Sequence, residues 1–311
     1  MSHMRRMLVV LTTAATLLGM AAPASAALIS PVRLLSIPAN QWEPAGNAAY
    51  YGYTSDTTAK PNHWDAIVYD RTSTATKKIN AAKTAGYFGG FDPGTNIAIY
   101  QQQKRSVSDI YTYDLDTSTR TAAPAAINSS WWEWGPRIST SYITFLRDVY
   151  AHKKWHTRVY IYDRTTFALT KLGNYPSGGT YNGFVGDQWA TWTVCGMTCT
   201  VYVYDAIAGG APQAVPTVKG RPEYGPTIDE TNGNLYYIRS GFGCGLKVNI
   251  WMVPIASLST TPVKLATLPS GIDAGELSLA PNAVSGQDLL FARLKCKGNV
   301  SDIWDVPQAV P

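Results

Sequence analysis

Four glutamates recur at matching points of this 311-residue chain. They are Glu43, Glu133, Glu223 and Glu276. Each stands about 22 to 26 residues before a reference strand that repeats along the sequence, so we expect them at one equivalent position of a repeating fold. Two carboxylates roughly 5 to 9.5 Å apart can hydrolyse a glycosidic bond. The four residues are therefore the candidate catalytic groups.

Aromatic residues accompany these carboxylates. Aromatic rings stack on the apolar faces of sugars and attract cations. The predicted ligand-binding residues are Trp42, Glu43, Tyr87, Trp132, Glu133, Trp134, Tyr181, Arg221, Glu223, Tyr224, Asp273 and Glu276. The alternative interpretation is structural, because Gly and Pro in Glu133-Trp-Gly-Pro136 and Glu223-Tyr-Gly-Pro226 fix a turn whose carboxylate can accept backbone N–H groups.

A short strand that recurs six times must position these side chains. Its copies begin at Asp65, Asp109, Arg158, Thr200, Asn249 and Asp302, at intervals of about 42 to 53 residues. β-branched and aromatic residues alternate with polar ones, and Gly, Pro, Asn and Ser separate the runs. This pattern predicts an all-β fold, a six-bladed β-propeller of four-stranded antiparallel blades.

The last repeat lacks a closing strand of its own. Pro31-Val-Arg-Leu-Leu-Ser-Ile-Pro38 matches the closing strand Pro262-Val-Lys-Leu-Ala-Thr-Leu-Pro269 in pattern. We therefore predict that the N-terminal strand completes the sixth blade, which removes an unpaired sheet edge. Residues 27–311 are then one propeller domain.

The first 26 residues resemble a secretory signal peptide. Arg5 and Arg6 precede the apolar run Met7 to Met20, and Ala24-Ser-Ala26 is typical of a signal-peptidase site. The run is too short for a membrane span. Cleavage after Ala26 lowers the formal charge from +5 by the two arginines, to +3. Because the remaining cationic residues are dispersed, nucleic-acid binding is not expected. We expect a secreted, monomeric bacterial protein.

The chain contains four cysteines, an even number that could form disulfides in an oxidising compartment. Cys195, Cys244 and Cys296 stand at nearly the same distance from the repeated strand, and Cys199 lies across a turn from Cys195. A Cys195–Cys199 disulfide would only cross a hairpin, and a Cys244–Cys296 disulfide would join neighbouring blades. Each of the other pairings requires one disulfide across two blades, which exceeds the Cα separation that a disulfide permits. Zinc binding is the weaker alternative, because Cys195 and Cys199 have no matching second pair.

Repeats such as Asp109-Ile-Tyr-Thr-Tyr-Asp114, with Gly225-Pro-Thr-Ile-Asp-Glu-Thr-Asn-Gly-Asn-Leu-Tyr-Tyr-Ile238, resemble the TolB-like, or WD40-like (PD40), six-bladed propellers. The resemblance covers nearly all of residues 27–311. Only relics of the Ser-Pro-Asp-Gly turn of that family remain, as in Asp92-Pro-Gly94 and Ala280-Pro-Asn282. No segment resembles the separate N-terminal α/β domain of the periplasmic TolB protein. The resemblance implies a scaffold without a shared catalytic set.

Other catalytic signatures are missing from the sequence, including Gly-x-Ser-x-Gly and His-Glu-x-x-His. His152 and His156 flank Lys153 and Lys154 in a long turn, which favours a solvated basic loop over a metal site. No cofactor is predicted, although carboxylate oxygens at the mouth would suit a structural calcium ion.

Two functions are consistent with these residues. The first is a binding module that recognises a glycan or a protein partner at the mouth of the central tunnel. The second is a secreted glycoside hydrolase or polysaccharide lyase that uses a pair of the glutamates, assisted by Arg221, Tyr224 or Tyr181.

Overall fold

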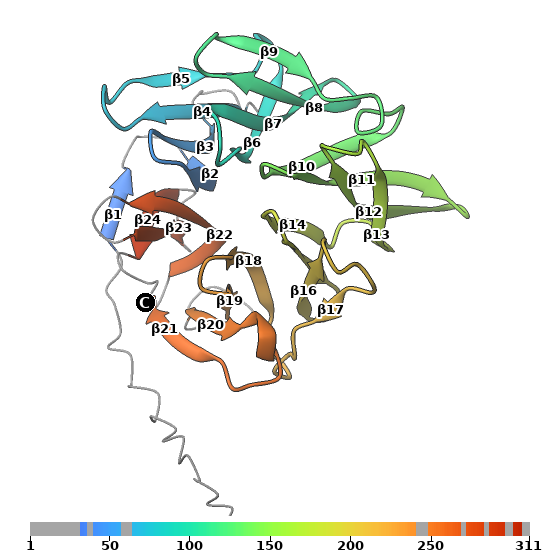
Figure 1. Cartoon of the computed structure of the whole chain (residues 1–311), viewed down its shortest axis with the longest axis vertical. Coiled ribbons are helices and arrows are strands. Elements are labelled where there is room, and N and C mark those ends of the chain that lie inside the picture. The colour runs from blue at the N-terminus through green and yellow to red at the C-terminus, as the bar shows by residue number, and fades with distance from the viewer. Residues whose placement is uncertain are drawn as a thin grey trace, which may run out of the picture.

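The computed structural model describes residues 32–35, 40–56, 64–240, 248–268, 272–282, 286–295 and 301–306. They form six antiparallel sheets of four strands, arranged in a ring around a common centre (Figure 1). The predicted six-bladed β-propeller is confirmed. The proposed signal peptide lies outside the described residues.

The blades are numbered in chain order. Blade one contains β2 (Asn40–Gly46), β3 (Tyr50–Asp56), β4 (Asp65–Asp70) and β5 (Thr76–Lys78). Blade two contains β6 (Ala85–Phe91), β7 (Ile97–Lys104), β8 (Val107–Asp114) and β9 (Thr119–Ala122). Blade three contains β10 (Trp132–Ile138), β11 (Tyr142–Ala151), β12 (Lys154–Asp163) and β13 (Leu169–Pro176). Blade four contains β14 (Thr180–Val185), β15 (Trp189–Cys195), β16 (Cys199–Asp205) and β17 (Gln213–Ala214).

The remaining strands complete the ring. Blade five contains β18 (Glu223–Asp229), β19 (Asn234–Arg239), β20 (Asn249–Pro254) and β21 (Val263–Thr267), with the 3-10 turn η1 (Ile255–Ser257) between the last two. Blade six contains β22 (Ile272–Asn282), β23 (Gly286–Lys295), β24 (Ser301–Val306) and β1 (Val32–Leu35). Within the described ranges, no helix has the length and apolar character that crossing a membrane requires.

The aspartate that ends the repeated strand has a clear local role. In blades one to four its carboxylate accepts backbone N–H groups from the residues two and three positions later, which closes the turn to the outer strand. The residues are Asp70, Asp114, Asp163 and Asp205. These backbone donors lower the pKa of Asp70, Asp114 and Asp163. The repeat therefore encodes a strand together with its turn.

The apolar core lies between neighbouring blades. Ile99 and Ile110 of blade two pack with Phe145 and Tyr160 of blade three in one buried cluster. Trp192 of blade four similarly packs against blade three. Four aromatic residues that recur with the repeated strand are found in such clusters. They are Tyr111, Tyr160, Tyr202 and Trp251.

The N-terminal strand closes the ring. β1 pairs antiparallel with β24, with Val32 opposite Asp305 and Leu35 opposite Ile303. In Figure 1, β1 lies beside β24 at the outer edge of blade six. The predicted completion of the sixth blade by the start of the chain is confirmed.

Six innermost strands surround the centre, namely β2, β6, β10, β14, β18 and β22 (Figure 1). The pairing of each of them with the second strand of its blade is interrupted by a register shift or β-bulge. A bulge re-aims the side chains that follow it. These irregularities decide which residues reach the centre.

Candidate functional site

Five aromatic side chains occupy one equivalent position in blades one to five. Each lies opposite the fifth residue of the second strand of its blade. They are Trp42, Tyr87, Trp134, Tyr181 and Tyr224. All five line the same cavity, which has a volume of about 520 Å³, and Gly275 lines it from blade six. We call this cavity the aromatic cup.

The four glutamates do not share one position, so that expectation is wrong. Glu133 and Glu223 lie opposite Arg147 and Arg239, the sixth residues of β11 and β19. In blade one the corresponding residue is Gln41, which lies opposite Ser55. Glu43 and Glu276 instead lie within the bulges of β2 and β22. Loops of different length hide this shift when residues are simply counted along the sequence.

Glu133 and Glu223 are buried behind the cup and do not line it. Neither side chain is exposed, and each accepts a hydrogen bond of 2.7 Å from the Nε of its arginine, Arg147 or Arg239. Burial raises the pKa of both carboxyls, while the adjoining guanidinium opposes this shift. The geometry gives these two glutamates a structural role, as the alternative interpretation of the sequence expected.

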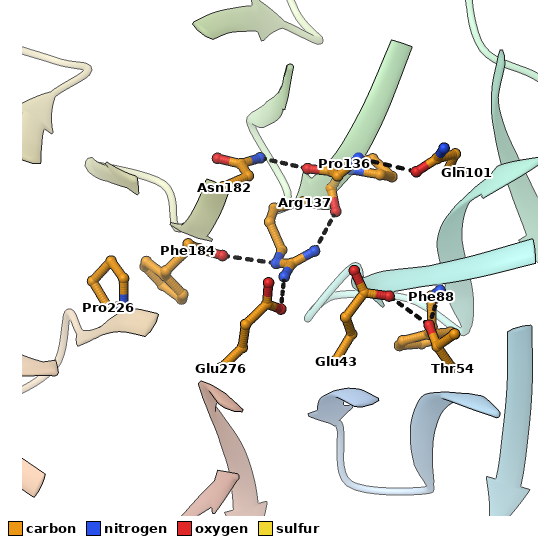
Figure 2. Close-up of polar contacts among 12 residues, drawn as sticks. Glu43, Thr54, Phe88, Gln101, Pro136, Arg137, Asn182, Phe184, Pro226 and Glu276 are labelled. Carbon is orange, nitrogen blue, oxygen red and sulfur yellow. Dashed lines mark hydrogen bonds and ion pairs between the residues drawn. The ribbon is translucent and has the colours of Figure 1, made fainter. Parts of the chain in front are cut away.

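The floor of the cup is formed by an arginine between two carboxyl groups. Arg137 donates through Nε to the carbonyl oxygen of Gly183 at 2.7 Å, through Nη1 to that of Pro136 at 2.9 Å, and through Nη2 to Glu276 (Figure 2). Glu43 accepts a hydrogen bond from the Thr54 hydroxyl and points toward the same arginine (Figure 2). Arg137 also lines a second hollow of about 360 Å³ at the far ends of the innermost strands. Its side chain therefore stands between the two hollows.

Glu43 has a left-handed backbone conformation and a raised pKa. Its φ is 52°, and the corresponding residues of blades three and five are Gly135 and Gly225, with φ of 57° and 59°. A side chain in this left-handed region costs about 1 to 2 kcal/mol. Burial, followed by the charge of Glu276, raises the pKa of Glu43 to about 7, although Arg137 and Thr54 favour its ionised form. A strained, partly protonated carboxyl in a cavity is typical of a functional group.

Four polar atoms of residues that line the cup have no described partner. The indole N–H groups of Trp42 and Trp134 are buried donors, and Asn182 Oδ1 and Thr193 Oγ1 are buried acceptors. Asn182 and Thr193 are 4% and 0% exposed. Buried polar groups are costly unless a partner satisfies them. Because these four atoms are enclosed by protein, the polar groups that line the cup for a ligand are those of side chains such as Glu43, Glu276 and Tyr181.

Several residues of the cup were missed by the sequence analysis. Trp64 bridges the rings of Trp42 and Tyr87, with a centroid separation of 6.4 Å to each. Arg137, Thr54, Asn182 and Thr193 also line the cavity. Thr54 and Thr193 occupy the position that is Leu146 in blade three and Ile238 in blade five, so a polar residue where other blades carry an apolar one was the available signal. Arg137 has no charged counterpart in the other repeats.

Besides Glu133 and Glu223, two predicted ligand-binding residues lie outside the lining of the cup, and the side chain of a third is not described. Trp132 begins β10 and is 39% exposed, outside the lining of the cup. Arg221 is exposed in the loop before β18 and is likewise not part of the lining. Asp273 belongs to β22, and its side chain lies outside the described ones.

The cysteine prediction is confirmed for one pair. Cys195 and Cys199 form a disulfide across the end of the β15–β16 hairpin, and Cys195 lines the cup. Cys244 and Cys296 lie outside the described residues, so their pairing stays a prediction. Among the described side chains, no group of three or more His, Cys, Asp or Glu is placed to bind a metal ion.

Solved structures of several other proteins share this architecture. TolB from Acinetobacter baumannii is 15% identical, with a TM-score of 0.56 over 84% of this chain and 64% of TolB. An oligogalacturonate lyase in complex with manganese is 10% identical, with a TM-score of 0.54 over 88% of this chain and 84% of the lyase. At these identities, the similarity of the two proteins to this chain is a similarity of fold.

The β-propeller domain of the Trilobed protease from Pyrococcus furiosus adds a third comparison, with 10% identity, a TM-score of 0.52, and coverage of 88% of this chain and 94% of that domain. The TolB-like six-bladed propeller fold expected from the sequence is thus confirmed, while this chain spans less than two thirds of the Acinetobacter TolB. No protein-family model and no curated protein matches the sequence.

Proposed function

We propose that this TolB-like propeller is a secreted binding module whose aromatic cup takes a neutral sugar ring of a glycan. The observation that carries the proposal is the set of five aromatic side chains at one equivalent position around a single cavity of about 520 Å³. That volume lies within the usual range of small-molecule sites. Aromatic faces pack on the apolar faces of sugar rings.

The polar side chains of the cup favour a hydroxylated ligand over a purely apolar one. Glu43, Glu276 and Tyr181 line the cavity, and their carboxyl and hydroxyl groups can exchange hydrogen bonds with sugar hydroxyls. A hydrocarbon ligand would remove these groups from water without offering a hydrogen bond in return.

The charges of the floor favour a neutral sugar. Arg137 and Glu276 neutralise each other, and Glu43 is partly protonated near neutral pH because its pKa is about 7. Three N–H donors of Arg137 already bind Gly183, Pro136 and Glu276, so the guanidinium is poorly available to a uronate carboxylate. This arrangement is less suited to the lyase alternative, in which a uronate must be neutralised.

Secretion is part of the proposal. It is supported by the signal-like sequence of residues 1–26 and by the Cys195–Cys199 disulfide, since disulfides persist in oxidising compartments.

The test is affinity electrophoresis of the protein in gels that contain neutral polysaccharides, followed by calorimetry with oligosaccharide fragments of those that retard it. Tyr181 is 47% exposed and lines the cup, so Tyr181→Ala should fold normally and weaken binding about tenfold, or about 1.4 kcal/mol. Phe167→Ala is the matched control, because Phe167 is 71% exposed and is not part of the cup. Equal binding by both variants would exclude the cup as the site.

A second candidate function is glycoside hydrolysis, with Glu43 as general acid and Glu276 as the partner carboxylate. The specific observation is the raised pKa of Glu43 beside the charge of Glu276. Release of reducing ends that is lost in both Glu43→Gln and Glu276→Gln would support this function. Binding without turnover would leave the binding module as the function.

A further inference from the structure

The β11–β12 hairpin of blade three projects beyond its neighbour in blade four. The pairing of β15 with β16 ends at Cys195 and Cys199. Cys195 is the seventh residue of its strand, as Asp148 is in blade three. Beyond Asp148, β11 and β12 continue through three further pairs, which end at Ala151 and Lys154. The blade-four hairpin is therefore shorter and is closed by its disulfide.

This difference in length leaves aromatic side chains uncovered. Tyr150 and Trp155 lie opposite each other in the projecting part, and both are 52% exposed. Because side chains alternate along a strand, they lie on the same side of the sheet as Leu146 and Val159. Leu146 and Val159 pack against blade four. Tyr150 and Trp155 therefore face the space above the blade-four hairpin.

These rings belong to a larger exposed group. The ring centroids of Tyr150 and Trp155 are 5.5 Å apart, and those of Trp131 and Trp155 are 6.5 Å apart. Trp131 and Trp132 are 40% and 39% exposed. We call Trp131, Trp132, Tyr150 and Trp155 the aromatic shelf.

The shelf adjoins the aromatic cup. Trp132 stands two residues before Trp134 in β10, so the two side chains lie on the same side of that strand, roughly 7 Å apart along it. Cys195, at the end of the blade-four hairpin, lines the cup itself. A ligand chain leaving the cup over blade four would thus pass along the shelf.

The shelf is preformed and carries positive charge at its outer end. His152 and Lys153 form the hairpin turn, with φ of 52° and 62°, as tight two-residue hairpin turns require. Lys153 and Lys154 are exposed at the tip of the hairpin; Lys153 belongs to the turn, whereas Lys154 begins β12 on the face opposite Trp155. A rigid surface that combines aromatic faces with ammonium groups fits sugar rings that bear acidic groups.

From this geometry we infer that the ligand is an acidic heteropolysaccharide: a neutral sugar ring occupies the cup, and an adjoining acidic sugar lies on the shelf with its anionic group toward the basic tip of the hairpin, where Lys153 forms the turn. The inference rests on the proposed function of the cup. An anionic membrane is the less suitable partner, because the rings of Tyr150 and Trp155 face sideways toward blade four, whereas a membrane-inserting hairpin presents its rings at the tip.

The experiment compares acidic heteropolysaccharides (hyaluronan, gellan and xanthan) with neutral xyloglucan and dextran, by affinity electrophoresis of the whole protein at low and high salt. The shelf variants are Tyr150→Ala/Trp155→Ala and Lys153→Gln/Lys154→Gln. Their controls are Phe167→Ala, which removes an exposed ring, and Lys171→Gln/Lys264→Gln, which removes two charges from the outer strands β13 and β21. Tyr181→Ala reports on the cup alone.

The inference predicts that at least one acidic heteropolysaccharide binds more tightly than both neutral polymers. Each shelf variant should weaken that binding about tenfold or more, and the lysine variant should also reduce its salt dependence. The two control variants should bind like the parent protein. Far-UV circular dichroism and the melting temperature of each variant establish that it is folded.

Three results would overturn it. If Tyr181→Ala weakens binding and the shelf variants do not, the cup binds glycan and the shelf does not take part. If none of the five polysaccharides binds, the shelf inference fails, and the neutral-glycan tests of the cup decide the proposed function separately. If the protein binds only vesicles of phosphatidylcholine with about a quarter of phosphatidylglycerol, and the shelf variants abolish this, the shelf is a membrane contact.

Discussion

Arg137 of β10 forms an ion pair with Glu276 of β22 across the centre of the ring (Figure 2). The two residues are 139 positions apart in the sequence and belong to blades three and six, which face each other in a six-bladed ring. The side chains are 13% and 27% exposed. The pair thus joins opposite blades at the floor of the cup.

Replacing Arg137 should destabilise the propeller. Arg137→Ala leaves Glu43 and Glu276 near each other without the cation, and we expect the free energy of unfolding to fall by about 1 to 3 kcal/mol, less than for a fully buried pair. Urea denaturation at pH 8 measures the change. The loss should be smaller at pH 5, where protonation relieves the repulsion, and an equal loss at both values would contradict this account.

Replacing Glu43 by glycine should stabilise the protein while weakening the site. Glu43→Gly removes a side chain from a left-handed backbone position and a carboxyl with a raised pKa, so we expect the free energy of unfolding to rise by about 1 kcal/mol. Ligand binding or turnover in the cup should fall. Glu43→Gln is the control, because it removes the charge and keeps the strain. A Gly variant no more stable than the Gln variant would show that strain contributes nothing.

The closure of the ring should make stability depend on pH. Burial, with the nearby charge of Asp288, raises the pKa of Asp305 to about 7, and Arg71 opposes the shift. Between its ordinary pKa of 3.8 and about 7, the folded state binds more protons than the unfolded state, so stability falls as the pH rises through this range. We expect a decline of about 1 to 3 kcal/mol. Denaturation at several pH values measures it, and Asp305→Asn should flatten the curve in this range.

The buried pair of Glu133 and Arg147 should matter for folding and not directly for binding. Arg147→Met leaves the carboxylate of Glu133 buried without its charged partner, which should cost about 3 to 5 kcal/mol. The affinity of the remaining folded protein should stay near that of the parent. A large loss of affinity with normal stability would instead place Glu133 in the ligand site.

The Cys195–Cys199 disulfide should contribute modestly to stability. Only four positions separate the two residues, so the constraint on the unfolded chain is worth about 2 kcal/mol at most. Thermal melts of Cys195→Ser/Cys199→Ser against the parent protein, both under non-reducing conditions, test this value. A much larger loss of stability would mean that the disulfide holds the blade-four side of the cup in place.

The sequence contained enough information for the fold and for much of the cup. Strands such as Arg158-Val-Tyr-Ile-Tyr-Asp163 alternate clearly, and the match between residues 31–38 and 262–269 identified the closing strand. Trp42, Tyr87, Trp134, Tyr181 and Tyr224 were all among the predicted ligand-binding residues, because their rings recur with the blades.

The carboxylates were harder to place for a physical reason. The connection between the second and third strands differs in length from blade to blade, so counting back from the repeated strand does not fix the register of the innermost strand. Glu43 and Glu276 therefore looked equivalent to Glu133 and Glu223, although the first two lie at the cup and the others lie behind it. Arg137 was missed because an ion pair between opposite blades has no periodic signal.

The pairing of β1 with β24 also sets the order in which the molecule can be completed. During synthesis, Val32–Leu35 leave the ribosome long before Ser301–Val306 exist, so the first strand made has to wait for the last. Until β24 has been made, blade six is incomplete and the ring of blades cannot close. The propeller can therefore become a closed, cooperative unit only after its last segment has been made.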